Sequence, residues 1–202
     1  MVTKRYRVSL HDAFIKYPIA EEIMFSRTTR KLKSLIEDVT DGQSIISLTS
    51  DGLKQYKKVA EDLGLKHQRC VFHLMKDCRT KVYKYLKKSK DDSVTKMSIV
   101  RYLTEINNVF RTYDECECLR RFKELLGKSE VLPSIIMKIL RNKVIPNFES
   151  LRQFTIDNFI PRTSNQAEQH YSATRKSETR RRFKTNEGLL EYLALFMSNE
   201  AI

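Results

Sequence analysis

Hydrophobic and polar positions alternate along the first part of the chain, as they do in strands. Residues 6–10 alternate apolar and polar side chains, and a second such segment covers residues 17–25, so the two predict an antiparallel hairpin around His11–Lys16. Residues 28–39 change to helical spacing, with Leu32, Leu35, Ile36 and Val39 on one face. After an Asp41-Gly42 turn, Ile45–Leu48 predicts a buried central strand.

The same pattern continues to about residue 86. Residues 53–63 predict a helix that ends at Gly64, residues 67–72 a short strand, and residues 74–86 a basic helix. The expected order is strand, strand, helix, strand, helix, strand, helix. We therefore predict an α/β fold in which Val8–Ala13, Ile19–Phe25, Ile45–Leu48 and Arg69–Phe72 form one mixed sheet.

The rest of the chain carries only helical patterns. Residues 88–158 contain little glycine and predict an all-helical block with helices near 97–113, 116–126 and 133–147. Two further helices are expected after Pro161, near 165–176 and 185–198. The chain is thus expected to have three parts, covering residues 1–87, 88–158 and 159–202.

Charge changes the picture by indicating a polyanionic partner. The 202 residues carry 38 Lys and Arg against 25 Asp and Glu, a formal net charge of +13, which favours nucleic acid, although a Lys-rich proteome would give the same balance. The sequence contains no apolar run of about 18 residues, so no membrane span is expected. Its start lacks the apolar core of a signal peptide. The cytoplasm, with reduced cysteine thiols, is the expected location.

Asp51-Gly52 directly follows the predicted central strand and is the first candidate for chemistry. A carboxylate at a strand end can project from the sheet edge, and oxygen ligands of this kind suit Mg²⁺ or Mn²⁺. The alternative is a surface Asx turn in which Asp51 caps the helix that follows.

Glu168 is the second candidate acid. Asn165 and Glu168 lie one helical turn apart, so both side chains could point at one metal site. The same spacing fits a capping box, in which Glu168 bonds back to the start of its own helix.

Cys70-x-x-His73 has the appearance of half a zinc site, which Cys78 or the pair Cys116-x-Cys118 could complete. The paired spacing of structural zinc sites is absent. Local packing or hydrogen bonding of Cys70 and His73 is the alternative.

A dense basic run follows the predicted helix of Glu168. Its members are Arg175, Lys176, Arg180, Arg181, Arg182 and Lys184, and Glu178 is the only acid among residues 175–184. Arginine forks suit phosphate oxygens, and the interleaved Tyr171 and Phe183 could stack on bases. We interpret the run as a DNA-contacting patch in preference to a solvated helix face.

Several of these motifs together resemble one known family. They are Thr49-Ser50-Asp51-Gly52, Tyr56, Gly64, the segment His67-Gln68-Arg69-Cys70-Val71-Phe72-His73-Leu74, and the segment Pro161-Arg162-Thr163-Ser164-Asn165-Gln166-Ala167-Glu168. Over about residues 5–198 the chain is similar to the Mutator-type transposases of insertion sequences. These enzymes use three acidic residues on a ribonuclease H-like catalytic domain.

The resemblance implies roles for individual residues. Asp51 matches the second catalytic aspartate and Glu168 the catalytic glutamate, so both are expected to bind metal. Cys70 and His73 match the Cys-x-x-His motif of the family, and Asn165 matches its polar residue before the glutamate. The helical block matches the insertion between the second and third acids. The implied reaction is two-metal phosphoryl transfer on DNA, at transposon ends and target, with possible homo-oligomers on DNA.

The start of the chain departs from that family pattern. The family places its first aspartate on a first strand, followed by two further strands and a helix, whereas only two strands precede the helix at 28–39 here. The resemblance thus implies that the first strand and the N-terminal DNA-binding region are missing, with Asp12 in the hairpin turn as an alternative first acid. We therefore expect this chain alone to show weak or no strand transfer.

Two other functions stay open at this point. A non-catalytic DNA-binding remnant of a transposase would need the basic run but no carboxylates. A zinc-stabilised interaction module would need Cys70 and His73 but no DNA.

Overall fold

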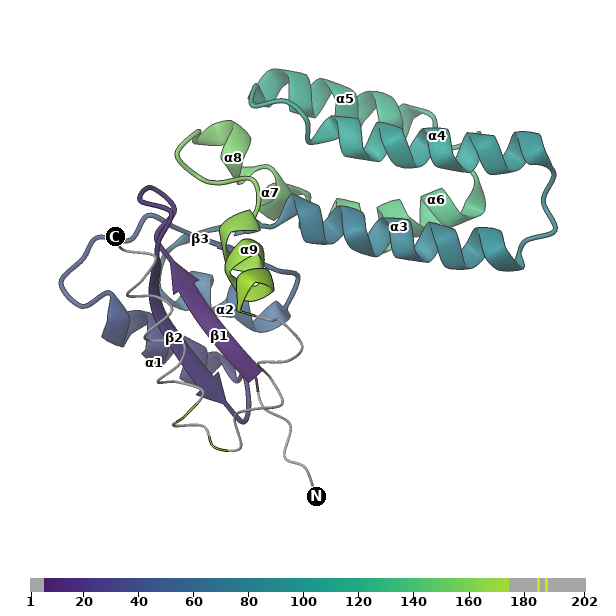
Figure 1. Cartoon of the computed structure of the whole chain (residues 1–202). Helices are drawn as coiled ribbons and strands as arrows, with labels where there is room; N and C mark the ends of the chain where they lie inside the picture. The colour runs from purple at the N-terminus through teal and green to yellow at the C-terminus, as the bar shows by residue number, and fades with distance from the viewer. Residues whose placement is uncertain (1–5, 175–184, 186–187, 189–202) are drawn as a thin grey trace. The chain divides into compact units, whose positions relative to one another are not determined.

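The computed structural model describes residues 6–174, 185 and 188 (Figure 1), and the chain divides into two compact units. The first unit takes the described parts of residues 1–46, 54–64 and 164–202, and the second takes residues 47–53 and 65–163. The structure is of mixed α/β type with small sheets. Within the described residues, no helix has both the length and the apolar character needed to cross a membrane.

The first unit is built on an antiparallel hairpin, as its alternating sequence predicts. Strand β1 covers Tyr6–His11 and strand β2 covers Pro18–Met24, with Ser9 opposite Glu21. The Asp12 carboxylate accepts hydrogen bonds from the backbone N–H groups of Phe14 and Ile15, at 2.7 and 3.0 Å. Asp12 therefore organises the hairpin turn, which is where the sequence placed it.

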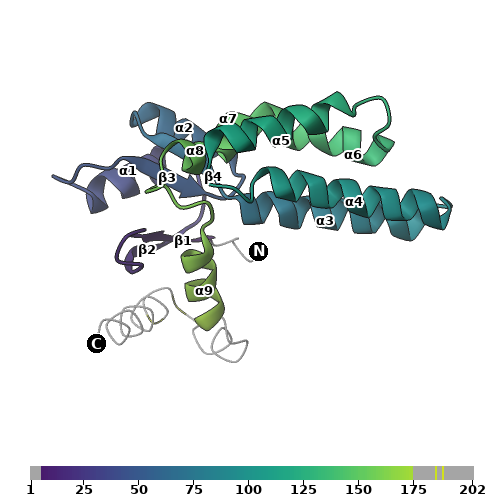
Figure 2. The ribbon, with the colours of Figure 1, turned by 90° about the horizontal axis from the view of Figure 1, so that it is seen from above.

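Helices cover both faces of this hairpin. Helix α1, Thr29–Val39, buries Leu32 and Ile36 and packs against α2, Lys54–Asp62. Helix α9, Asn165–Ala173, packs on β1, and Figure 2 shows it on the face of the hairpin opposite α1. Alternation along the strands explains this layering, because Val8 and Met24 are buried toward one side and Arg7 and Glu21 project to the other.

The second unit contains a parallel strand pair. Strand β3, Ser47–Ser50, pairs with β4, Lys66–Arg69, with Ser50 opposite Arg69. The prediction of one mixed sheet is wrong for the described residues, which form two separate two-stranded sheets. Both strands of the parallel pair are only four residues long, so they offer few backbone groups for a further partner.

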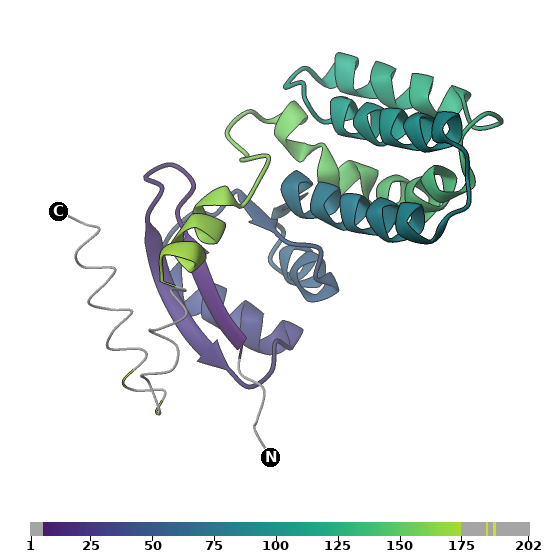
Figure 3. The ribbon, with the colours of Figure 1, turned by 45° about the vertical axis from the view of Figure 1, so that its right-hand side comes forward.

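The helical part of the second unit follows the sequence prediction, since the chain forms no strand between residues 88 and 158. Its elements are α3 (Val71–Lys88), α4 (Ser93–Val109), α5 (Glu115–Gly127), α6 (Ser134–Ile139), the π-helix η1 (Leu140–Val144), the 3₁₀-helix η2 (Ile145–Asn147), α7 (Phe148–Leu151) and α8 (Gln153–Ile156). The side chains of Asp92 and Asp114 cap α4 and α5 by accepting hydrogen bonds from backbone N–H groups. Figure 3 shows α3, α4 and α5 running alongside one another.

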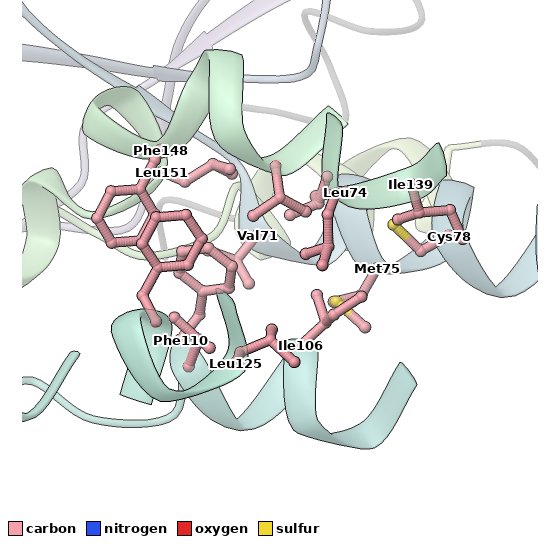
Figure 4. Packing of buried hydrophobic residues seen from close by; sticks show 14 of the residues in the cluster. Val71, Leu74, Met75, Cys78, Ile106, Phe110, Leu125, Ile139, Phe148 and Leu151 are labelled. Carbon is pink, nitrogen blue, oxygen red and sulfur yellow. The ribbon is translucent and has the colours of Figure 1, made fainter. Parts of the chain in front are cut away.

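One hydrophobic core joins these helices, and Figure 4 shows part of it. Val71, Leu74, Met75 and Cys78 of α3 face this core, and the rings of Phe122 and Phe148 stack at 3.7 Å within it. This packing corrects one sequence prediction. The strand expected to reach Phe72 ends at Arg69, because from Val71 onward the apolar residues recur at helical spacing and are buried on a helix.

Candidate active site

Asp51 lies directly after β3, in the loop that leads to α2. Its side chain is partly buried, and its Oδ1 atom accepts a hydrogen bond from the Leu53 N–H at 2.9 Å. The Asx turn considered as an alternative is thus formed. The turn fixes the orientation of the carboxylate at the end of the strand, so the structural and chemical interpretations of Asp51 do not exclude each other.

Gly52 makes room for a buried arginine beside Asp51. A Cβ atom at Gly52 would lie 2.6 Å from Nη2 of Arg69, which is closer than unbonded atoms approach. The Arg69 side chain is only 9% exposed, and its burial lowers the pKa of the guanidinium, while the charges of Asp77, Cys78 and Asp51 act in the opposite direction. The glycine after Asp51 thus leaves room for the end of the Arg69 side chain, which would have to shift if a Cβ were added.

Residues 161 and 162 are hydrogen-bonded to β3 and to the first residue of α3. The Thr49 hydroxyl donates to the Pro161 carbonyl oxygen at 3.2 Å, and the Val71 N–H donates to the Arg162 carbonyl oxygen at 3.2 Å. Arg162 in turn donates to the carbonyl oxygen of Phe110 at 3.3 Å. Motifs that lie far apart in the sequence thus meet at the end of the β3–β4 pair.

Hydrogen bonds between polar groups of the second unit stabilise the same strand end. Ser50 Oγ and His67 Nε2 lie 2.9 Å apart, and the Cys70 N–H donates to the Ser50 carbonyl oxygen at 2.7 Å. Gln68 is completely buried and makes three hydrogen bonds, to the carbonyl oxygens of Arg69 and Leu151 and from the N–H of Phe154. Gln68 lies between His67 and Arg69 in the sequence, and this position gives no sign of its burial.

Cys70 and His73 are placed by the start of α3. Cys70 is fully buried at the N-cap, and the His73 ring meets Phe72 edge to face at 5.7 Å. Burial raises the pKa of the Cys78 and Cys118 thiols to about 11. In the described part of the chain, no three His, Cys, Asp or Glu side chains gather as a metal site would require.

Glu168 lies in the first turn of α9. The N-cap of this helix is Ser164, not Asn165, and no side chain caps the helix. Asn165 is the first helical residue and is exposed, so the capping box considered as the alternative for Asn165 and Glu168 is not formed. The Glu168 N–H donates to the Ser164 carbonyl oxygen at 3.2 Å, as in an ordinary first turn. A carboxylate in the first turn also interacts favourably with the helix dipole.

A buried polar network fixes α9 on the hairpin. The Oε1 atom of Glu21 accepts from Nε of Arg7 at 3.0 Å and lies 2.8 Å from Nε2 of His170. The Glu21 and His170 side chains are each only 3% exposed. Arg7 also donates to the Thr174 hydroxyl at 2.5 Å and lies over the Tyr171 ring at 5.0 Å. These contacts orient the helix that carries Glu168.

This network was missed by the sequence analysis, although a signal was present. Arg7, Ser9 and His11 alternate along one face of β1, and polar residues on a face that should be covered are unusual. His11 packs edge to face on His170 at 5.2 Å. Burial lowers the pKa of His11 to about 4, with the charges of His170 and Arg7 acting in the same direction against that of Glu21.

Two parts of the predicted site stay predictions. Asp51 belongs to the second unit and Glu168 to the first, so their meeting at one metal is not established. The basic residues Arg175, Lys176, Arg180, Arg181, Arg182 and Lys184 lie outside the described residues.

Comparison with known proteins relates the chain to a protein of an insertion element. The chain is 30% identical over 197 residues to an uncharacterised 48.3 kDa protein of the insertion element ISM1 from Methanobrevibacter smithii. The match covers 98% of this chain and 49% of the relative, so the chain spans about half the length of the curated relative it matches. No family model matches the chain, and no solved structure gives a significant match.

Proposed function

We propose that this chain is the catalytic part of a DNA transposase that cleaves and joins DNA strands by metal-dependent phosphoryl transfer, and that the chain alone has weak or no strand-transfer activity. The observation that carries the proposal is the hydrogen-bonded junction at the end of β3, where Thr49, two residues before Asp51, donates to Pro161 in the segment that precedes α9 and Glu168 in the sequence. The similarity to an insertion-element protein supports a transposase-related role. A ribonuclease H-like fold of the catalytic domain is part of this proposal.

Asp51 and Glu168 would hold Mg²⁺ or Mn²⁺. Their chemistry fits, because Mg²⁺ takes one or two protein carboxylates together with phosphate oxygens of the substrate. Neither side chain is fully exposed, and each is positioned by a defined local structure, an Asx turn for Asp51 and a helix first turn for Glu168. When bound, the metal ions would neutralise charge on the scissile phosphate and lower the pKa of a bound water.

The remaining residues would bind and orient DNA. In this proposal the basic run at 175–184 contacts phosphates, Cys70 and His73 hold the start of α3 against β3, and Asn165 lies one turn before Glu168. The guanidinium of Arg69 would hold a positive charge near the Asp51 carboxylate. The protein would act in the cytoplasm on transposon ends and target DNA, as a homo-oligomer assembled on that DNA.

One observation favours a second candidate. The described residues contain no cluster of three acidic or other metal-binding side chains, whereas the proposed chemistry in related enzymes uses three acids. A DNA-binding protein without catalytic activity would satisfy this observation. It would still need the positive charge of the chain but not the carboxylates of Asp51 and Glu168.

Nicking of supercoiled plasmid separates the two candidates. The chain is incubated with plasmid and Mg²⁺ or Mn²⁺, and the Asp51→Ala and Glu168→Ala variants are compared with Asp41→Ala and Glu130→Ala as controls at exposed acids. We expect weak, metal-dependent nicking that both site variants lose and both controls keep. DNA binding without any nicking, in either metal, would favour the non-catalytic candidate.

A further inference from the structure

One exposed face of α3 carries aromatic and basic side chains in a single row. We call this row the α3 stripe, and its members are Phe72, Lys76, Arg79, Tyr83 and Lys87. Each member is three or four positions from the next, so all lie on the same side of the helix. All five are exposed.

The aromatic members of the stripe have no role in the core of the second unit. Phe72 is 39% exposed and Tyr83 is 68% exposed, whereas α3 packs into the core through its opposite face, which includes Leu74, Cys78 and Val82. An exposed phenylalanine and tyrosine on one helix face leave apolar surface in water, which costs free energy unless a partner covers it.

The charge on this face has one sign. Asp77 is the only acidic residue in α3, and it lies off the stripe, where Lys143 pairs with it at 3.4 Å. Within the stripe the Lys76 ammonium lies 6.0 Å from the centre of the Phe72 ring. A partner that fits this surface must therefore offer negative charges at intervals and flat rings that can stack on aromatic side chains.

The stripe begins at the strand end that carries Asp51. The Cys70 N–H donates to the carbonyl oxygen of Ser50, the residue before Asp51, and Phe72 lies in the first turn of the helix that follows. From Phe72 to Lys87 the helix rises about 22 Å, at about 1.5 Å per residue. A linear partner lying along the stripe would therefore lead directly away from the candidate cleavage site.

We propose that the α3 stripe binds a single strand of DNA next to the cleavage site, with phosphates on Lys76, Arg79 and Lys87 and bases stacked on Phe72 and Tyr83. The proposal rests on the proposed function in naming DNA as the nucleic acid. Single-stranded DNA fits better than duplex, because the faces of paired bases are covered by their neighbours in the duplex. The site is separate from the basic run at 175–184.

Binding of a fluorescent single-stranded oligonucleotide to the full chain tests the aromatic contacts. We expect Phe72→Ala and Tyr83→Ala to weaken binding by at least about fivefold each, the low end of what stacking of a base on an aromatic ring contributes. Phe72→Tyr and Tyr83→Phe keep a ring at each position and should bind like the wild type. The affinity of the protein for blunt duplex DNA should fall much less in the two alanine variants.

The basic contacts are tested by the salt dependence of the same binding. The triple variant Lys76→Ala, Arg79→Ala, Lys87→Ala should reduce the slope of log K against log salt by about 2, since each phosphate contact on a single strand contributes about 0.7. The control removes one arginine and two lysines at exposed positions elsewhere in the same unit, Arg111→Ala, Lys123→Ala, Lys138→Ala. It should leave the slope nearly unchanged.

Several results would contradict the proposal that the α3 stripe binds single-stranded DNA. These are unchanged oligonucleotide binding in both alanine variants, an equal loss for duplex DNA, or equal slopes for the two triple variants. If the wild-type chain binds no DNA, both the proposed role of the α3 stripe and the proposal that DNA is the partner of this chain are wrong. A stripe that behaves as expected in a chain that shows no Asp51-dependent nicking would overturn the catalytic proposal alone.

Discussion

Thr49 and Pro161 are hydrogen-bonded across 112 positions of sequence, the Thr49 hydroxyl donating to the Pro161 carbonyl oxygen at 3.2 Å. Thr49 belongs to β3, two residues before Asp51, and Pro161 belongs to the segment that leads into α9. This bond and its neighbour between Val71 and Arg162 tie residues 161 and 162, which precede α9 in the sequence, to the strand end of the second unit.

Thr49→Val should test that link, because it removes the hydroxyl and keeps the branched shape. We expect the free energy of unfolding to fall by about 0.5–1.5 kcal/mol, the usual net contribution of one hydrogen bond. Urea denaturation followed by circular dichroism measures the change. Thr49→Ser retains the donor and should lose less than Thr49→Val, and equal losses would show that the hydrogen bond contributes nothing.

Gly52→Ala should destabilise the protein because of Arg69. The added Cβ would lie 2.6 Å from the Arg69 guanidinium, and overpacking of a buried site costs about 1–3 kcal/mol. In an Arg69→Ala background the same substitution should cost much less, so a double-mutant cycle should show a coupling energy. Additive effects of the two substitutions would mean that the glycine is needed for the backbone conformation at position 52 and not for contact with Arg69.

Glu21→Gln should loosen α9 from the hairpin. The substitution keeps the shape of the side chain but removes the charge that faces Arg7 and His170, both of which are largely buried. Removal of one partner from a buried ion pair costs about 3–5 kcal/mol, and the partial exposure of Arg7 places this loss toward the lower end or below it. Glu22→Gln, at an exposed neighbouring position, is the control in thermal and urea unfolding.

The stability of the protein should depend on pH through His11. The pKa of His11 is lowered to about 4 in the folded chain from 6.5, so the unfolded chain binds a proton more readily in this interval. The contribution of His11 is present above pH 6.5 and is lost as the pH falls toward 4. His170, Glu21 and Arg7 face the ring. His11→Gln should flatten the decrease in unfolding free energy between pH 6.5 and 4, and an unchanged pH profile would contradict this assignment.

Gln68→Met should cost more than its position in a basic segment suggests. Methionine has a similar length but leaves the buried N–H of Phe154 without its acceptor, and an unsatisfied buried group costs about 1–3 kcal/mol. His67→Gln, one position earlier in the same strand, keeps polar atoms and should cost less. Chemical denaturation of both variants gives the comparison.

Local signals in the sequence predicted the elements well, and the longer-range arrangement less well. The hairpin and the helical block follow from alternation and helical spacing, because these periods reflect which side chains are buried. The mixed sheet was predicted from strand order, but strand order does not reveal which edges pair. The strand predicted to reach Phe72 failed because an apolar run such as Cys70-Val71-Phe72 fits a strand and a buried helix start equally.

In the candidate site too, local features could be predicted from the sequence and long-range contacts could not. The sequence pointed to Asp51, and the Asx turn that orients it could also be foreseen from the Asp-Gly pair. The buried positions of Arg69, Gln68 and Glu21 could not be, since these residue types are usually exposed and their partners lie far away in the sequence. The capping box considered as the alternative at Asn165 is not formed, because the helix starts one residue earlier than an asparagine N-cap would require and Ser164 is its N-cap.

The bond between Thr49 and Pro161 also has a consequence during synthesis on the ribosome. A nascent chain that has just exposed β3 must wait for 112 further residues before Pro161 arrives, which takes roughly 6–22 s at about 5–20 residues per second. Until then the strand end that carries Asp51 lacks its long-range support. A ribosome that stops within the helical block would therefore release a chain that holds a basic helix but cannot assemble the candidate cleavage site.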